Sequence, residues 1–204
     1  MTVVLSLIIL IMSVVIHEVA HGFAAEKLGD PTARLAGRLT LNPFKHLDPV
    51  GSFIVPILTW ISGGFVFGWA KPVPYNPYNL QKGRWSEAFV AIAGPVSNLL
   101  LATVFGLFIR FGISFLPQVM LGVFVLIIIV NIGLAVFNLI PIPPLDGSKI
   151  LFALLPAHLS HIREMLERYG FVLVLLFIII LSQFQIIEPA ISFLFELVTG
   201  LSLP

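Results

Sequence analysis

Two histidines and a glutamate stand close together in an otherwise apolar stretch near the start of the chain. The stretch reads VVIHEVAHG, in which His17, Glu18 and His21 form the pattern HExxH. On a helix, His17 and His21 lie one turn apart on the same face, where both imidazoles can bind one metal ion. The glutamate between them can activate a water on that metal. The spacing therefore predicts half of a zinc site with hydrolytic chemistry.

The surroundings of the motif weigh against the alternative that these are two unrelated histidines near a helix end. The stretch from about Thr2 to Lys27 is apolar and long enough to span a membrane. His21 precedes Lys27 by six residues, which places it about 9 Å deeper at the rise of a helix. Ionisable groups at that depth are costly and mark a functional site by default, so we favour metal ligation.

The third ligand of such a site has few candidates, because a catalytic zinc ion uses three protein ligands and one open position. The chain has no cysteine, which leaves histidine, aspartate or glutamate. Asp30 and Asp48 lie in GDP and LDP turns, where capping or solvated roles are expected. Asp146 follows a proline-rich stretch that cannot be helical, so the chain can turn at Gly147 toward the metal. Asp146 also suits the N-cap of the next helix, but alongside HExxH we favour it as a ligand.

The composition indicates a membrane protein. The 204 residues are 58% hydrophobic and 10% charged, and the mean hydropathy is +1.07. A soluble domain of this length needs more polar surface than that. The net charge of +1 gives no reason to expect a nucleic-acid partner. We expect a single domain over residues 1–204, with a catalytic core over about 1–150.

The predicted fold class is an all-α polytopic membrane protein. About four full transmembrane helices are expected, near residues 2–27, 84–111, 119–140 and 169–181. Residues 34–42, RLAGRLTLN, alternate with the period of a strand and predict a short membrane-associated β-hairpin or strand. The apolar tail, residues 186–200, is short for a span and predicts an interfacial helix.

The apolar stretch at residues 50–68 is broken by a proline and a pair of glycines. If this stretch enters the membrane and returns on the same side, only Arg110 of the 11 lysines and arginines lies near the outer face. We therefore expect a re-entrant segment, with a full crossing as the alternative. The same distribution predicts a multi-pass protein of the cell membrane whose metal site lies toward the cytoplasmic side.

Asn98 ends the motif GPVSN, residues 94–98, in the expected helix at 84–111. A primary amide in an apolar helix needs a partner, and this one is predicted to act in catalysis by binding the substrate backbone or the developing oxyanion. The alternative is a hydrogen bond between helices. Interfacial positions are expected for the remaining histidines and for the tryptophans: His46, His158, His161, Trp60, Trp69 and Trp85. For His46, the alternative is a position behind the metal ligands or on the substrate side.

Three motifs together resemble the site-2 protease family of intramembrane zinc metalloproteases. They are HExxH in the first helix, GPVSN in the next, and NLIPIPPLDG at residues 138–147. The stretches RLAGRLTLNPFKHLDPVGS and FGWAKPVPYNPYNL resemble the small bacterial and archaeal members that lack PDZ and CBS domains. The resemblance covers most of the chain up to about Ile150. It implies one Zn²⁺ per chain, bound by His17, His21 and Asp146, with Glu18 as the catalytic base.

The function implied by this resemblance is hydrolysis of peptide bonds within or near transmembrane segments. The expected partners are the lipid bilayer and substrates that are single-span membrane proteins or signal peptides, while the oligomeric state is open. A helical substrate must unwind first, and residues 34–42 are predicted to hold it by edge pairing while the Pro-rich loop at 69–79 forms the other wall of the cleft.

Two alternatives remain at this stage. A zinc transporter can also carry HExxH, but it should place ligands along a path on several helices, whereas the ionisable groups here converge at one depth. A non-catalytic membrane scaffold with a structural zinc would have no use for Glu18. The effect of Glu18→Gln on zinc retention and cleavage separates these possibilities.

Overall fold

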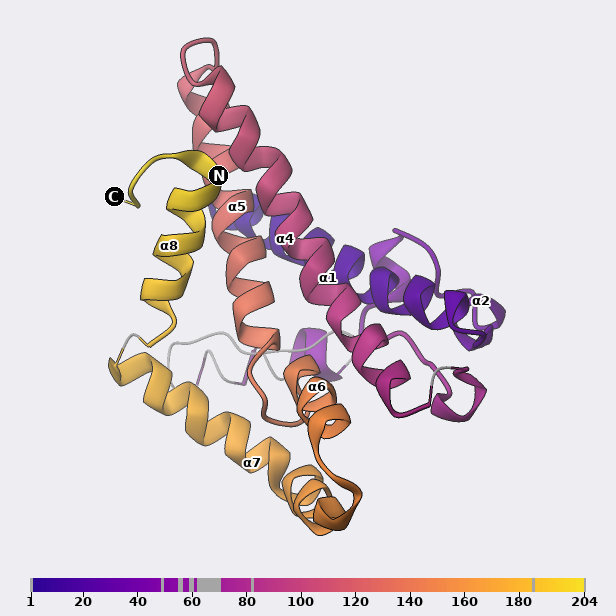
Figure 1. The fold of residues 1–204 in the computed structure, drawn as a ribbon. Helices are drawn as coiled ribbons and strands as arrows, with labels where there is room; N and C mark the ends of the chain where they lie inside the picture. The colour runs from indigo at the N-terminus through magenta and orange to yellow at the C-terminus, as the bar shows by residue number, and fades with distance from the viewer. Residues whose placement is uncertain are drawn as a thin grey trace.

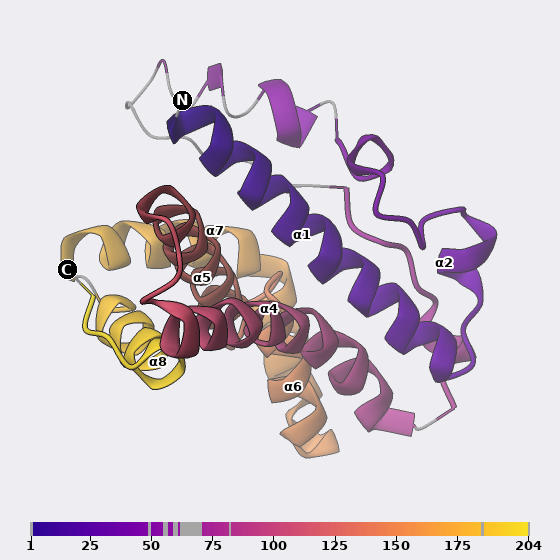
Figure 2. The ribbon, with the colours of Figure 1, turned by 90° about the horizontal axis from the view of Figure 1, so that it is seen from above.

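The helices are arranged around α4 (Ser86–Gly112), which contacts α1, α5, α6 and α8 (Figures 1 and 2). The computed structural model describes residues 2–48, 50–54, 57–58, 61, 71–81, 83–184 and 186–203. Besides α4, its α-helices are α1 (Thr2–Lys27), α2 (Thr32–Leu35), α5 (Gln118–Asn138), α6 (Asp146–Leu154), α7 (Ser160–Phe184) and α8 (Glu188–Thr199). Short 3₁₀ turns lie at Pro43–Lys45, Pro77–Asn79, Gly83–Trp85 and Ala157–Leu159, and a π-helical turn lies at Val50–Ile54.

α1 begins and ends where its sequence predicts. Gly29 adopts a φ of 102°, the left-handed conformation that glycine favours, directly after the helix. The amide of Gly29 donates to the Glu26 carbonyl, and the amide of Asp30 donates to the Ala25 carbonyl, so the last carbonyls of the helix are paired. The turn expected at Gly29-Asp30-Pro31 after this helix is confirmed.

Among the described residues, three helices are long and apolar enough to cross a membrane, namely Val4–Lys27, Gly83–Gly112 and Gln118–Asn138. They correspond to the first three spans expected from the sequence. Pro95 lies inside α4 without ending it. The described residues are mostly helical and include helices that could cross a membrane, as predicted, whereas the total of about four spans remains a prediction.

α7 begins earlier than the span expected near residues 169–181, because residues 160–184 form one helix. It runs at an angle to α5 and α8 at one end of the molecule (Figure 1). Charged groups hold its first turns: Arg163 lies 3.8 Å from Glu87 of α4, and Glu167 lies 3.8 Å from Lys149 of α6. Further along, a Cβ atom at Gly170 would stand 2.6 Å from the Pro143 carbonyl oxygen, so α7 packs closely on the loop before α6.

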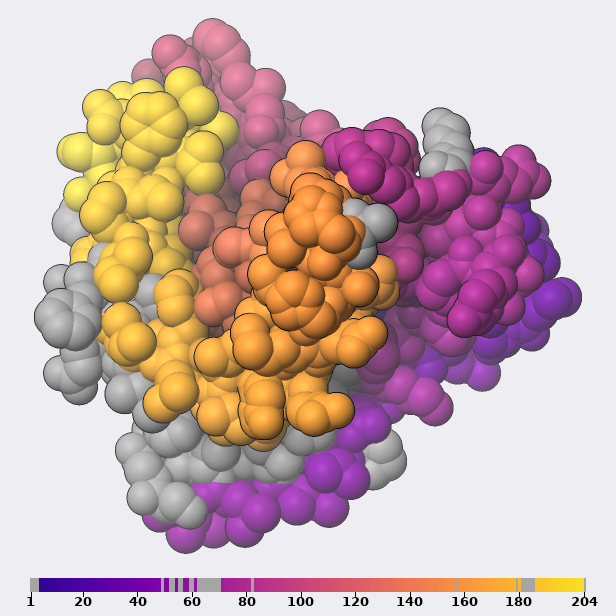
Figure 3. Space-filling view, turned by 60° about the horizontal axis from the view of Figure 1, so that its bottom comes forward, coloured from indigo at the N-terminus to yellow at the C-terminus, as the bar shows by residue number. Residues whose placement is uncertain are grey.

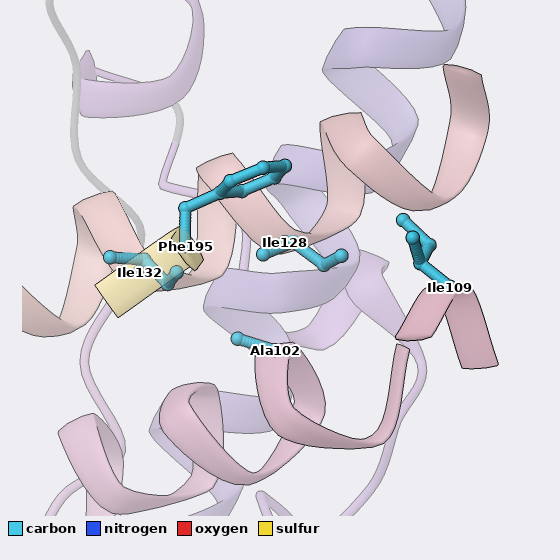
Figure 4. Close-up of a cluster of buried hydrophobic side chains, with 5 residues drawn as sticks. All are labelled: Ala102, Ile109, Ile128, Ile132 and Phe195. Carbon is cyan, nitrogen blue, oxygen red and sulfur yellow. The ribbon is translucent and has the colours of Figure 1, made fainter. Parts of the chain in front are cut away.

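The apolar core lies between α4, α5 and α8 (Figure 4). Ile109, Ile128 and Ile132 are fully buried there, and Phe195 of α8 is 2% exposed. The tail therefore forms the helix that the sequence predicts, with Gly200 in the left-handed conformation at its end. Its position at a membrane interface remains a prediction.

The strand predicted at residues 34–42 is wrong. Arg34 and Leu35 belong to α2, and a turn with Gly37 at a φ of 64° follows, so the alternating pattern is interrupted. The burial is also the reverse of the expectation, because Leu35 is 81% exposed while Arg38 is buried. The physical reason is that the Arg38 guanidinium donates hydrogen bonds to the Lys71 and Pro72 carbonyls, which draws it inward. Within the described residues there is no β-strand.

The predicted re-entrant segment at residues 50–68 falls largely outside the described residues. Only the turn at Val50–Ile54 and helical residues 57, 58 and 61 are described within it. Trp60 and Trp69 also lie outside, and Trp85 is 40% exposed beside Arg84. The re-entrant path and the interfacial tryptophans therefore remain predictions.

The Pro-rich segment at residues 71–81 runs beside the second half of α1 (Figure 2). Gly22 makes room for it, since a Cβ atom there would stand 2.9 Å from the Val73 side chain. Tyr75 packs on the cluster formed by Ala25, Leu28 and Val90. On the face shown in Figure 3, this segment and the start of α4 border α6 and the start of α7. The segment therefore lies close to the residues that carry the HExxH motif.

Candidate metal centre

α1 presents His17 and His21 side by side. Their ring centroids are 4.7 Å apart in an edge-on arrangement, and both residues are buried. The arrangement follows from the four-residue spacing on a helix, which places the two side chains on one face. Both Nε2 atoms face the beginning of α6, where Asp146 lies.

Asp146 completes the cluster from 125 residues further along the chain than His21. Its Oδ2 lies 3.0 Å from the His17 Nε2 and 3.3 Å from the His21 Nε2. The loop before α6 folds tightly, since a Cβ atom at Gly147 would overlap the Leu139 carbonyl oxygen. Asp146 is the first residue of α6, and the residue in the N-cap position, Leu145, offers no side-chain cap. The structure therefore brings together the two histidines and the aspartate that the sequence singled out.

The three side chains suit a metal ion. Their ligand atoms lie within 4.8 Å of one another, and no other such group of three occurs among the described residues. Two imidazoles and one carboxylate are a ligand set of catalytic zinc sites, which keep a fourth position open. With zinc at this position, the carboxylate and the two Nε2 atoms would bind the ion instead of one another.

Gly94 leaves the space that such an ion requires. A Cβ atom at position 94 would stand 2.5 Å from the Nε2 of His17 and 2.5 Å from the Nε2 of His21. Any side chain there would occupy the region that the two nitrogens face. The first residue of the GPVSN motif therefore lets α4 approach the centre without filling it.

Each imidazole is oriented by a partner on α4 through its other nitrogen. The His21 Nδ1 donates to the Val90 carbonyl at 2.8 Å, and the His17 Nδ1 donates to the Asn98 Oδ1 at 2.5 Å. Such hydrogen bonds place the proton on Nδ1 and leave the lone pair of Nε2 for a metal. Both histidines therefore present the nitrogen that faces Asp146.

The catalytic role predicted for Asn98 stays a prediction, and the structure shows the contacts that its amide makes. It is fully buried, and its amide nitrogen donates to the Asn131 Oδ1 and the Ser13 carbonyl. Its oxygen accepts from His17. With its groups engaged in this way, Asn98 supports a ligand, and these contacts favour the interhelical alternative over contact with an oxyanion.

Glu18 contacts the Pro-rich segment. Its Oε2 accepts a hydrogen bond of 2.8 Å from the backbone amide of Val73. Val73 is buried, and the flanking Lys71 amide donates to the His46 carbonyl at 2.8 Å. The segment that carries Val73 is thus held against the HExxH helix at the glutamate.

Asp30 anchors the same segment at the end of α1, a role that the sequence did not indicate. The carboxylate is fully buried and accepts hydrogen bonds from the Asn76 amide at 2.6 Å and the Asn79 Nδ2 at 2.8 Å. Thr32 donates to it as well. Burial alone would raise the pKa of Asp30, but these hydrogen bonds outweigh it and hold the pKa below its ordinary value.

The remaining histidines lie apart from the centre. His46 is 1% exposed, and its Nε2 contacts the Thr40 carbonyl at 2.9 Å, so it is buried in the loop after α2. His158 and His161 are exposed. None of the three joins the cluster of His17, His21 and Asp146.

Helices long enough to span a membrane, with a two-histidine, one-aspartate centre between them, define a class of intramembrane metalloprotein. The model of peptidase family M50 matches residues 5–119 and 113–181, and the chain belongs to this family. The resemblance to site-2 proteases predicted from the motifs is thereby confirmed.

Relatives of the chain include three proteins named as candidate zinc metalloproteases. YwhC of Bacillus subtilis is 43% identical over 82% of this chain and 77% of its own length. Rip2 of Mycolicibacterium smegmatis is 31% identical over 83% of this chain and 64% of its own length. MJ0611 of Methanocaldococcus jannaschii is 43% identical over 30% of this chain and 31% of its own length. No solved structure matches the chain.

Proposed function

We propose that the chain is a zinc-dependent endopeptidase that hydrolyses peptide bonds within or next to transmembrane segments. Membership of peptidase family M50 and the names of YwhC and Rip2 support a zinc metalloprotease. The single observation that carries the proposal is the convergence of the His17, His21 and Asp146 ligand atoms within 4.8 Å, next to Glu18.

In this proposal one Zn²⁺ is held by His17, His21 and Asp146. When bound, zinc supplies a Lewis acid that polarises the scissile carbonyl and lowers the pKa of a water molecule. Glu18 takes a proton from the attacking water and passes it to the leaving nitrogen. Asn98 and the Val90 carbonyl keep the two imidazoles oriented throughout.

The Pro-rich segment is proposed as one wall of the substrate cleft. The Val73 amide bonds to Glu18, so residues 71–76 run past the position where a scissile bond must lie. These residues are outside regular secondary structure and are held against the HExxH helix through Val73. The predicted pairing with a strand at 34–42 is withdrawn, because that strand does not exist.

The same elements support a proposal for the location of the enzyme. We place it in the cell membrane as a multi-pass protein, with α7 as the fourth span and α8 at an interface. Lys27, at the end of α1, and the basic residues of the following loops favour a metal centre toward the cytoplasmic side. The proposed substrates are single-span membrane proteins or signal peptides, whose segments can reach a centre between helices.

The rival functions receive less support. A transporter needs ligands along a path, but the described residues hold one cluster of three metal-binding side chains. A scaffold with a structural zinc would fill the fourth ligand position, which the three-ligand set leaves open. The protease is therefore the function that the geometry supports best.

The test is Glu18→Gln in the full chain reconstituted with a single-span substrate. We expect one zinc per chain to be retained while cleavage falls by about 10²-fold or more, as for loss of a general base. Glu196→Gln, at an exposed position of α8, is the matched control and should cleave normally. Unchanged cleavage by Glu18→Gln, or zinc transport that depends on the same three ligands, would refute the proposal.

A further inference from the structure

A line of buried polar side chains leads from His17 away from the metal centre, into the interface of α1, α4 and α5. Ser13 lies one turn before His17, Asn98 comes from α4, and Asn131 comes from α5. Ser13 is 4% exposed and both asparagines are fully buried. Primary amides are costly between apolar helices unless their donors and acceptors are paired. The hydrogen-bond partners of these side chains therefore indicate how each amide is oriented.

The amide of Asn131 has a fixed direction. Its Nδ2 donates to the Ile127 carbonyl at 2.9 Å and to the Ser13 Oγ at 2.9 Å. A backbone carbonyl can only accept, so the nitrogen of Asn131, and not its oxygen, must face Ile127. The Oδ1 of Asn131 is therefore turned toward Asn98.

The orientation of the Asn131 amide fixes the orientation of the Asn98 amide. Its Nδ2 donates to the Asn131 Oδ1 at 2.8 Å and, over a longer distance of 3.3 Å, to the Ser13 carbonyl. With the nitrogen committed to that side, the Asn98 Oδ1 faces His17 and accepts from its Nδ1 at 2.5 Å. The Nδ1 of His17 must then carry the proton, which leaves Nε2 free for a metal.

We propose that Asn131 is a positioning residue of the metal centre. Acting through Asn98, it fixes which nitrogen of His17 is protonated and so presents Nε2 toward Asp146. This role rests on the proposed function for the identity of the metal, and it extends that function to a residue that contacts neither metal ligand nor metal. His21 needs no such relay, because the Val90 carbonyl accepts from its Nδ1 directly.

The expected effect follows from the position of Asn131 in the line. Partners behind a metal-bound histidine change metal affinity by roughly 10- to 100-fold. Asn131 is one hydrogen bond further away, but its bond with Asn98 is shorter than the one from Asn98 to Ser13. We therefore expect its loss to weaken zinc binding by about tenfold, the lower end of that range.

The test measures the zinc affinity of an Asn131 variant and of a control variant, each in the full chain, by competition with a chromophoric chelator. Asn131→Leu removes the amide. If this leucine variant does not fold, Asn131→Ala is used in its place. Thr103→Val is the matched control, because it removes a hydrogen bond of 2.8 Å to the Leu99 carbonyl on α4 outside the line. An Asn131 variant that folds and binds zinc as tightly as Thr103→Val would overturn the proposal.

A spectroscopic readout tests the protonation directly. In the zinc-loaded wild-type chain labelled with ¹⁵N-histidine, His17 should show a protonated Nδ1 and a metal-bound Nε2. A metal-bound Nδ1 at His17 would overturn the relay. Both readouts need no substrate, so they are separate from the cleavage test. Unaltered affinity in Asn131→Leu refutes the positioning role alone, whereas absence of zinc binding in the wild type refutes the proposed function.

Discussion

Gly94 of α4 lies directly against the imidazole of His17, on the side of its Nε2. A Cβ atom at position 94 would stand 2.5 Å from that nitrogen, and equally close to the Nε2 of His21. Real Cβ atoms essentially never make contacts this short. The two helices therefore meet at the metal centre only because residue 94 has no side chain.

Gly94→Ala should disrupt the centre. The added methyl group competes with both imidazoles for the region that a metal must occupy, so we expect loss of bound zinc and a fall in cleavage of about 10²-fold or more. Zinc content by elemental analysis, together with cleavage of a single-span substrate, measures the effect. Gly122→Ala on α5 is the control, because a Cβ atom there meets nothing within 4 Å. Equal zinc content in the two variants would contradict this description of the site.

Val73→Pro should weaken catalysis without removing zinc. Proline has no backbone N–H, so this variant deletes the hydrogen bond that Glu18 accepts. Hydrogen bonds to charged groups contribute about 1.5–3 kcal/mol, which corresponds to roughly a tenfold loss or more in kcat/KM. Val73→Thr keeps the N–H and a similar shape, and it should cleave almost normally. If both variants cleaved at the wild-type rate, the contact would have no part in orienting Glu18.

Asp30→Asn should destabilise the protein at neutral pH. The buried carboxylate accepts hydrogen bonds that attach the Pro-rich segment to α1, and we expect a loss of about 1–3 kcal/mol on replacing the charge. Because the folded pKa of Asp30 lies below its ordinary value of 3.8, the stabilisation is complete above that pH and is lost as pH falls through the folded pKa. Thermal unfolding of wild type and variant, measured from about pH 3 to pH 7, checks this prediction. If the difference in stability between wild type and variant became larger toward acid pH, the prediction would be wrong.

Cleavage should depend on metal and not on thiols. The chain has no cysteine, so alkylation with N-ethylmaleimide has no target thiol and should leave activity unchanged. A zinc chelator such as 1,10-phenanthroline should abolish cleavage, and added Zn²⁺ should restore it, since the proposed ligands are nitrogen and oxygen atoms of the chain. Full activity after verified removal of the metal would exclude a metalloprotease.

The candidate metal ligands could be predicted from the sequence because they either lie close together in the chain or come from a small set of candidates. The spacing of His17 and His21 fixes their common face on any helix, and the apolar length of residues 2–27 requires that helix. Asp146 is favoured because the other two aspartates lie in evident turns and the extended chain before it can turn toward the metal, with a helix N-cap as the alternative. The packing of the helices then shows that Asp146 lies beside the two histidines.

The loop contacts were not predictable, because they join segments far apart in the chain. Asp30 looked like a solvated turn residue, yet its partners are Asn76 and Asn79 in the Pro-rich segment. The alternation at residues 34–42 suggested a strand, but Gly37 turns the chain and Arg38 is drawn inward by the Lys71 carbonyl. Nothing in either segment alone indicates its distant partner.

The role of Asn98 shows the same limit. A buried amide beside a metal motif fits both an oxyanion donor and a link between helices, and the sequence cannot separate the two. The hydrogen bonds from the amide nitrogen of Asn98 to Asn131 and Ser13 favour the link between helices. The residue type indicated that Asn98 is important, whereas its hydrogen-bond partners on α1 and α5 indicate what its amide does.

The central claim is that one zinc ion is held by His17, His21 and Asp146, and the zinc content of purified chain after dialysis tests it most directly. We predict one zinc per wild-type chain, nearly none in Asp146→Ala, and an unchanged value in Asp48→Ala, whose carboxylate instead pairs with the Val50 and Gly51 amides. Retention of one zinc per chain by folded Asp146→Ala would contradict the account.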